Sequence, residues 1–390
     1  MTKMIKLSLA AAVAVSALTT TATAGSLEDS IKDTTISGKI LVGYNFSSEK
    51  ASGNDETSNN SEYDIDLTLN TKVNDTITAQ VGFQADNDND NRDEVTVSQT
   101  VQLTKLNFTA KTDVATVIVG KQKQPTPFFD DERGDGVVAL VPAGPVTIAA
   151  GHFTGLNSKL DFNASTDNGN FDIENRDISA LAVIGTVGPV NASLWYATLS
   201  GANSYGAAED GATAYSLNLA GTFGPVNVDL THSSAELENE GVASYDDESL
   251  TKLIVSSTVA GVNLVAGYGF TNDNKDNKRN HGVDLTADND AKTNFRLDQI
   301  VLDKYNDADA LLLGASMTFG VTTVGANYLA ATIDGADAGD AKTKGKELDL
   351  TVKYAMSKNF SITGLYADTE IKSDGVKSQD STHMEQIGRA

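Results

Sequence analysis

A strict alternation of apolar and polar residues is the feature that most constrains how this chain folds. It runs through residues 63–70, 77–84, 226–231 and 348–354, and helical periodicity is almost absent after residue 33. Successive side chains of a β-strand point to opposite faces, so each segment predicts a strand with one apolar and one polar face. The predicted fold class is therefore all-β. Such strands fit either a soluble sandwich or a transmembrane barrel whose apolar side chains face lipid.

Connection lengths separate these two architectures. Very short turns alternate with long polar segments, which fall near 47–62, 86–94, 124–135, 154–175, 200–211, 235–247, 271–308, 333–345 and 370–383. An up-and-down membrane barrel has tight turns at one end and long loops at the other, whereas a Greek-key sandwich mixes lengths at both ends. The pattern predicts one domain, residues 25–390, that forms a transmembrane up-and-down antiparallel β-barrel with long extracellular loops, the longest at 271–308.

About 18 strands fit between these connections. We place them at 34–46, 63–73, 76–86, 95–111, 115–123, 137–142, 146–153, 176–187, 190–199, 212–223, 226–234, 248–259, 262–270, 309–319, 321–332, 346–356, 359–369 and 384 onward. Sixteen to eighteen strands leave an aqueous channel. The fourth candidate changes phase between Leu103 and Leu106, which predicts a β-bulge. From Met384 the last candidate is shorter than the ~9 to 11 residues of a spanning strand, so we expect a truncated last strand and a compromised closure.

Several of the short turns share the sequence Gly-Pro-Val, at residues 144–146, 188–190 and 224–226. Glycine adopts the backbone angles of a tight turn, and proline is tolerated at the first position of a strand. Alternation then assigns the faces. Charged side chains on the lipid face cost roughly 2 to 4 kcal/mol for Arg or Lys near the midplane. We therefore expect Asp64, Asp66, Gln80, Asp229, Asp349 and Lys353 to face the lumen, and Ile65, Leu67, Leu69, Val81, Phe83, Val228, Leu230, Leu350 and Val352 to face lipid.

The first 24 residues predict a secretory signal peptide. Lys3 and Lys6 precede a short Ala-rich apolar core, and an Ala-x-Ala site at 22–24 predicts cleavage between Ala24 and Gly25. The apolar run is about 12 residues, whereas a spanning helix needs roughly 20. Without the two signal lysines, the 29 basic residues become 27 against 53 acidic ones, a net charge of −26. Such a charge disfavours nucleic acid and attracts cations.

Residue types that carry catalysis are sparse. The chain has no cysteine and only four histidines, and none of these has His-x-x-x-His spacing. Thiol chemistry and a zinc site are therefore not expected, and the chain is predicted to be neither an enzyme nor dependent on a cofactor. Residues 86–90 place acidic and amide oxygens as calcium prefers, but the calcium-loop pattern breaks at Asn91 and Val97, so a solvated acidic loop is the simpler interpretation.

Two stretches resemble a known family, the campylobacterial major outer membrane porins. One is SLEDSIKD at 26–33, followed by ISG at 36–38, and the other is GKQ at 120–122, followed by TPF at 126–128. The long, Asp-rich loop that contains ADNDA at 287–291 is also similar. The resemblance implies an 18-stranded homotrimeric barrel of the cell outer membrane, in contact with lipid and lipopolysaccharide. It also implies passive diffusion of ions and small hydrophilic solutes past a third loop folded into the lumen. Family members can bind calcium near the lumen, which makes Asp130, Asp131 and Glu132 possible ligands here.

The segment 124–135 has a composition that suits a pore constriction. Pro125 and Pro127 stiffen it, and Phe128 and Phe129 need a surface on which to pack. Both signs of charge follow, and rings of charge are how pores select ions. The expected constriction set is Lys121, Asp130, Asp131, Glu132, Arg133 and Asp135, with a modest preference for cations. An ordinary outer loop that touches a trimer neighbour remains the alternative for this segment. For the whole chain the alternative is a surface adhesin or structural barrel.

Overall fold

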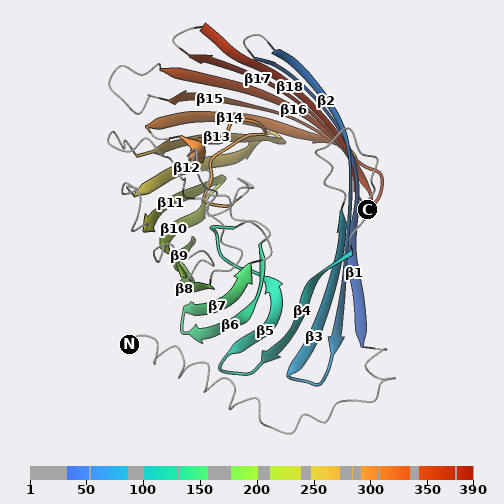
Figure 1. The fold of residues 1–390 in the computed structure, drawn as a ribbon, viewed down its shortest axis with the longest axis vertical. Coiled ribbons are helices and arrows are strands. Elements are labelled where there is room, and N and C mark those ends of the chain that lie inside the picture. Colours follow the sequence, from blue (N-terminus) through green and yellow to red (C-terminus); the bar gives the residue numbers. More distant parts are fainter. Residues whose placement is uncertain are drawn as a thin grey trace, which may run out of the picture.

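The chain forms one closed antiparallel barrel of 18 strands (Figure 1). The computed structural model describes residues 33–51, 54–86, 101–129, 132–156, 177–200, 211–238, 247–272, 283, 291–305, 307–333, 342–373 and 376–389. Strand β1 (Thr34–Ala51) pairs with both β2 (Asn54–Lys72) and β18 (Val376–Arg389), which closes the sheet. No helix among the described residues has the length and hydropathy of a membrane span.

Every other strand pairs with its neighbours in sequence, as in an up-and-down barrel. These strands are β3 (Ile77–Asp86), β4 (Val101–Lys111), β5 (Thr116–Lys123), β6 (Arg133–Ala143), β7 (Val146–Leu156), β8 (Asp177–Val187), β9 (Val190–Ser200), β10 (Gly211–Phe223), β11 (Val226–Glu238), β12 (Glu248–Val259), β13 (Val262–Thr271), β14 (Ala308–Phe319), β15 (Thr322–Ile333), β16 (Thr343–Ala355) and β17 (Ser361–Ser373). A short 3-10 helix, η1 (Leu302–Lys304), precedes β14. The predicted strand count and fold class are confirmed.

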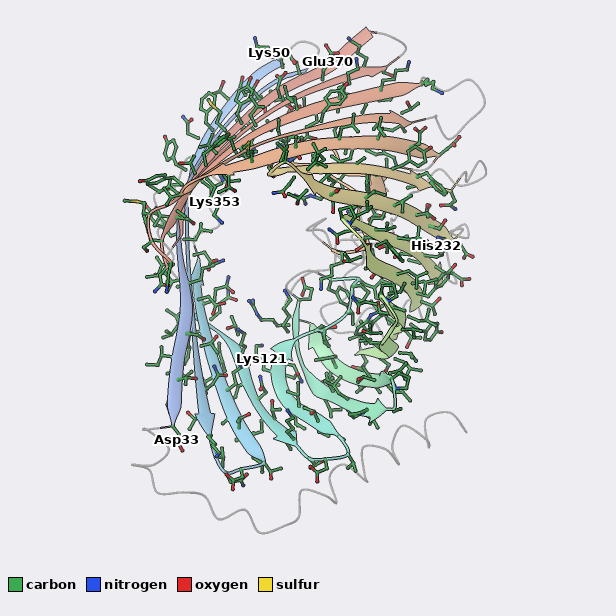
Figure 2. The ribbon with its side chains drawn as sticks, turned by 180° about the vertical axis from the view of Figure 1, so that it is seen from behind. Asp33, Lys50, Lys121, His232, Lys353 and Glu370 are labelled. Atoms are coloured by element: carbon green, nitrogen blue, oxygen red, sulfur yellow. The ribbon has the colours of Figure 1, made fainter. Side chains whose placement is uncertain are left out.

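Two predicted loops are wrong, because their residues extend paired strands. Segments 47–62 and 370–383 lie mostly within the hairpins β1–β2 and β17–β18, and β18 begins at Val376 rather than Met384. The last strand is therefore longer than expected, and it pairs along β1 from Leu41 to Ala51, while residues 34–40 of β1 pair with β2. These extensions are polar on both faces, so they lack the alternation by which a strand is recognised. Lys50 and Glu370 lie at the end of the barrel where these extensions are. Asp33, just before β1, lies at the opposite end (Figure 2).

The short turns and the bulge follow from local sequence. Gly144, Gly188 and Gly224 have φ of 66°, 60° and 63°, the sign that a type II′ hairpin turn requires at its first central position. On β4, the register with β3 shifts so that Gly82 faces Lys105 while Phe83 faces Leu103. The bulge predicted between Leu103 and Leu106 is thus confirmed, with Thr104 as the extra residue.

The two faces of the wall differ as the alternation indicates. Large apolar side chains are exposed on one face, among them Ile65 (48%), Leu67 (39%), Leu230 (38%), Leu350 (44%) and Val352 (50%). This is the outer, lipid-facing side. The buried apolar residues form two clusters on the inner face, one over β6–β11 and one over β12–β15. The core of the protein therefore lies inside the barrel, where chain segments cover the wall.

Candidate functional site

Two segments of the chain lie against the inner wall. We call the described residues 124–129 and 132 the first inward segment and residues 291–305 the second inward segment. The first connects β5 to β6, and the second precedes β14. Each one packs on a different sector of the wall, and both lie inside the ring of strands (Figure 1).

The first inward segment is held mainly by aromatic packing. Phe128 and Phe129 are 0% and 2% exposed and join Val138, Phe153 and Ile178 in one cluster. The backbone N–H of Gln124 donates to the carbonyl of Glu132 at 2.8 Å, which closes the base of the segment. The Gln124 side chain is buried, and neither atom of its amide has a hydrogen-bond partner among the described residues.

The expected constriction residues do not lie in one loop, because some belong to strands β5 and β6. Asp130 and Asp131 lie outside the described residues, and Glu132 is buried at the end of the first inward segment. The expected segment 124–135 is too long, because Arg133 and Asp135 belong to β6. Asp135 is the register partner of Lys121 on β5. A strand begins at Arg133 because residues 133–137 continue the ladder with β5.

The second inward segment has an apolar side that fits the wall closely. Phe295, Ile300 and Leu302 join Leu250 and Leu329 in the second cluster. Glycines on the inner face make room for this packing. A Cβ on Gly269 would lie 2.7 Å from Cγ of Phe295, and a Cβ on Gly345 would lie 2.9 Å from Cδ1 of Ile300. Real Cβ contacts are not this short, so the wall is shaped to receive the segment.

Charged side chains of the wall also anchor the second inward segment. Lys252 of β12 donates from Nζ to the carbonyls of Lys292 and Asn294, at 2.5 and 2.6 Å. The Glu347 carboxylate of β16 accepts the backbone N–H groups of Gln299 and Ile300, both at 2.7 Å. Charge-assisted hydrogen bonds of this kind are stronger than neutral ones. They fix the backbone of the segment at two places on the wall.

A further contact ties this segment to the closing strand. Nδ1 of His383 on β18 lies 2.6 Å from Oδ2 of Asp298, which also accepts from Gln299. Burial raises the pKa of Asp298, but hydrogen bonds from His383 and Gln299, together with attraction from His383 and Arg296, outweigh it. The pKa of Asp298 therefore lies below its ordinary value, and the carboxylate is charged at neutral pH.

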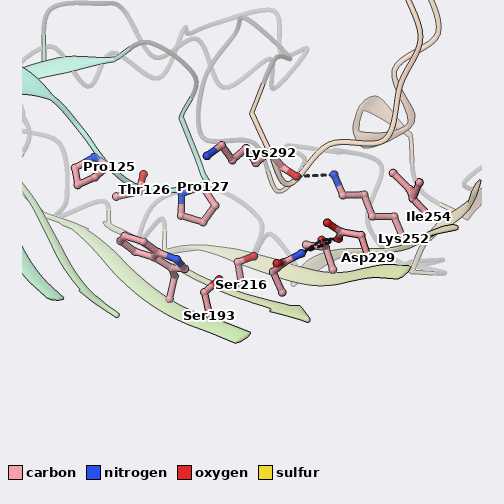
Figure 3. Close-up of a pocket in the computed structure, with 12 residues that line it drawn as sticks. Pro125, Thr126, Pro127, Ser193, Ser216, Asp229, Lys252, Ile254 and Lys292 are labelled. Carbon is pink, nitrogen blue, oxygen red and sulfur yellow. Dashed lines mark hydrogen bonds between the residues drawn. The ribbon is translucent and has the colours of Figure 1, made fainter. Parts of the chain in front are cut away.

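A cavity of about 420 Å³ lies where the two segments approach each other (Figure 3). The first inward segment contributes Pro125, Thr126 and Pro127, and the second contributes Lys292. The floor is the inner face of β9–β12, and its lining residues are Ser193, Trp195, Ser216, Asn218, Asp229, Thr231, Lys252 and Ile254. The cavity therefore touches four strands and both segments.

The remaining predicted lumen residues lie elsewhere on the wall. Asp64 forms an ion pair with Lys39 of β1, and Asp66 lies two residues further along β2. Asp349 is buried beside Glu347 on β16, and Lys353 lies nearer the end of the same strand. Among the described residues no group of three His, Asp or Glu is placed to hold a metal. The candidate set at Asp130 falls partly outside the described residues, and the predicted cleavage site at Ala24 falls wholly outside them.

The sequence interpretation missed the second inward segment and treated 271–308 as an outer loop. The signal was present in the sequence. Phe295, Ile300 and Leu302 are apolar residues in a polar loop, which is the argument that picked out Phe128 and Phe129. The inner-face glycines Gly267 and Gly269 on the preceding strand were a second signal, because a strand interior seldom favours glycine.

Comparisons with known proteins agree with this architecture. Among solved structures, the chain is similar to Pseudomonas aeruginosa OccK9 (OpdG), with TM-score 0.66 and 14% identity over 93% of this chain and 98% of that one. OccK3 (OpdO) of the same organism gives 0.64 and 15% over 93% and 97%, and Acinetobacter baumannii OccAB4 gives 0.62 and 11% over 91% and 98%.

At the level of sequence, no curated protein matches the chain. A family model described as Gram-negative porin matches residues 9–374. Family and fold indicate an outer-membrane channel for small solutes rather than an enzyme. The chain belongs to the Gram-negative porin family.

Proposed function

We propose that this porin is a passive, modestly cation-preferring channel whose lumen is narrowest between the two inward segments. The observation that carries the proposal is the cavity itself, because Pro127 and Lys292 line it from opposite segments. Two segments that meet at one place restrict the cross-section of the lumen there. Lys121, Arg133 and Asp135 lie next to the first segment, and we place Asp130, Asp131 and Glu132 in the same constriction.

Cation preference is supported by the excess of acidic residues. The net charge without the signal peptide is −26, and we place acids such as Asp64, Asp66 and Asp349 on the inner face of their strands. Charges at the cavity are mixed, with Asp229 beside Lys252 and Lys292. Exposed charges are screened within about 8 Å at physiological salt, so only those near the narrow region act strongly. We therefore expect a modest preference.

Single-channel recording in a planar bilayer tests the proposal. A steady ohmic current is expected, together with a reversal potential of cationic sign in a salt gradient. Replacing Asp130, Asp131 and Glu132 by Asn, Asn and Gln should reduce the cation preference and leave folding intact. An anionic reversal potential would show that acids outside the pore dominate the net charge. Absence of current would instead favour a plugged, adhesive or structural barrel.

Three further assignments rest on the sequence resemblance. We propose that the chain lies near the campylobacterial major outer membrane porins within the wider family, on the strength of residues 120–122 and 126–128. We also propose a homotrimer in contact with lipopolysaccharide, and calcium as a ligand of Asp130, Asp131 and Glu132. Mass measurement in detergent and calcium titration of the asparagine and glutamine variant test the last two.

A further inference from the structure

The only tryptophan of the chain lies inside the barrel. Its neighbours on β9, Leu194 and Tyr196, are 51% and 50% exposed on the outer face, and alternation places Trp195 on the inner face. Tryptophan usually gathers in the belts where a membrane protein meets the lipid headgroups. Here it lines the cavity beside Pro125 and Pro127. One end of the cavity is therefore an apolar surface of rings.

Next to this surface the strands present a grid of neutral polar groups. Trp195 is the register partner of Ser216, Ser193 is the partner of Asn218, and Asn218 is in turn the partner of Thr231. Directly opposite residues of an antiparallel pair have Cβ atoms roughly 4.5–5.5 Å apart. The floor thus carries closely spaced hydroxyl and amide groups, which can both donate and accept hydrogen bonds.

The two charged groups of the floor, Asp229 and Lys252, each make hydrogen bonds within the protein. Oδ1 of Asp229 accepts from Asn218 at 2.7 Å and from Thr231 at 3.3 Å. The Lys252 ammonium donates to the carbonyls of Lys292 and Asn294. Only the Lys292 side chain runs along the roof toward Pro127 (Figure 3). The cavity therefore presents neutral hydrogen-bonding groups and an aromatic ring, with the Lys292 side chain at its roof.

We propose that this cavity is a binding subsite for small uncharged polyhydroxylated solutes of monosaccharide size. Such a solute has an apolar C–H face, which packs on Trp195 and the proline rings, and hydroxyl groups, which bond to the hydroxyl of Ser193 and the amide oxygen of Asn218. The volume of about 420 Å³ falls within the range of roughly 300 to 1,000 Å³ typical of small-molecule sites. The subsite rests on the proposed channel function and gives that function a substrate class.

The single tryptophan supplies a direct test. Purified protein in detergent is titrated with glucose while the fluorescence of Trp195 is followed. A saturable change is expected, with half-saturation in the millimolar range, because a channel site must release its solute. Sodium acetate, titrated in the same way, should give none. Asn218→Ala and Ser193→Ala should each raise the half-saturation concentration roughly fivefold, the effect of one lost hydrogen bond.

Asn70→Ala is the matched control, because Asn70 accepts a hydrogen bond from Gln80 on the distant β2–β3 wall. It should leave the glucose titration unchanged. If one of the two floor variants fails to fold, the other still tests the subsite. A linear response up to molar glucose, a saturable response to acetate alone, or floor variants that titrate like Asn70→Ala would each overturn the subsite. Bilayer current from the same preparation separates the proposals: current without a glucose response removes the subsite alone, and absence of current removes the channel.

Discussion

The two inward segments reach the same cavity but are attached to the barrel in different ways. The first depends on buried rings, chiefly Phe128 and Phe129, and its buried Gln124 amide has no partner among the described residues. The second adds charged anchors to its apolar cluster, from Lys252 on one side and Glu347 on the other. Apolar packing is non-directional, whereas hydrogen bonds to backbone groups fix the position of each residue.

This difference suggests that the two segments respond to different perturbations. A segment held by rings loosens when a ring is removed, and it is insensitive to pH or salt through those rings. A segment held by charged groups loosens when an anchor changes its charge or its hydrogen-bonding pattern. The variants below separate these behaviours.

The largest effect is expected for Phe128→Ala. Removing a fully buried phenylalanine ring costs about 3 to 5 kcal/mol, which here falls on the packing of the first inward segment. Single-channel recordings should show a higher mean conductance and stronger current fluctuations. Phe108→Ala serves as control, because that ring is 56% exposed on the outer face and should leave the current as it was. Equal currents in both variants would mean that the first segment does not narrow the pore.

Glu347→Gln tests the anchor of the second inward segment. The amide keeps one acceptor oxygen and turns a donor toward the other backbone N–H, so Gln299 or Ile300 loses its partner. Leaving a buried donor unsatisfied costs about 1 to 3 kcal/mol. We expect increased current noise that grows with temperature. Asp113→Asn, at an exposed turn, is the comparison variant and should leave the current noise unchanged. If Glu347→Gln had the same current noise as the unsubstituted protein, the apolar cluster alone would fix this segment.

Gly269→Ala tests whether the position beneath Phe295 must lack a side chain. The new Cβ would lie 2.7 Å from Phe295 and 3.2 Å from Leu302, so the segment must shift. Overpacking of this kind costs about 1 to 3 kcal/mol. Guanidinium unfolding followed by Trp195 fluorescence measures the loss. Gly151→Ala, whose nearest contact would be 3.4 Å on the other wall, should cost much less. Similar losses at both sites would contradict a wall shaped for Phe295.

The smallest effect is expected from acid. The pKa of Asp298 lies below its ordinary value of 3.8, so its contribution is complete above that pH and is lost as pH falls through the lower folded value. Current noise from the second segment should therefore rise as the pH falls below 3.8. Asp298→Asn should lack this rise, having lost the charge at every pH. An unchanged acid response in that variant would assign it to other acids, such as Glu347 and Asp349.

Much of the fold was predictable because alternation reports the lipid boundary. The two faces of segments such as 226–231 and 348–354 meet lipid and lumen, so residue type follows position. The Gly-Pro turns and the bulge at Thr104 are local in the same sense. Prediction was wrong at 47–62 and 370–383, because the sequence of those strands is polar at nearly every position and lacks the alternation. These segments are strands because their backbones pair with the neighbouring strands.

The sequence by itself determined an all-β barrel of about 18 strands and the positions of its short turns, and it assigned two distinct faces to the strands that alternate. These follow from a period of two and from the transfer energy of each side chain. Only the tertiary structure decided that 291–305 turns inward, that Lys252 and Glu347 hold it, and that Trp195 faces a cavity between two segments. Those contacts join residues tens of positions apart, and a local pattern contains no record of which distant surface a segment will cover.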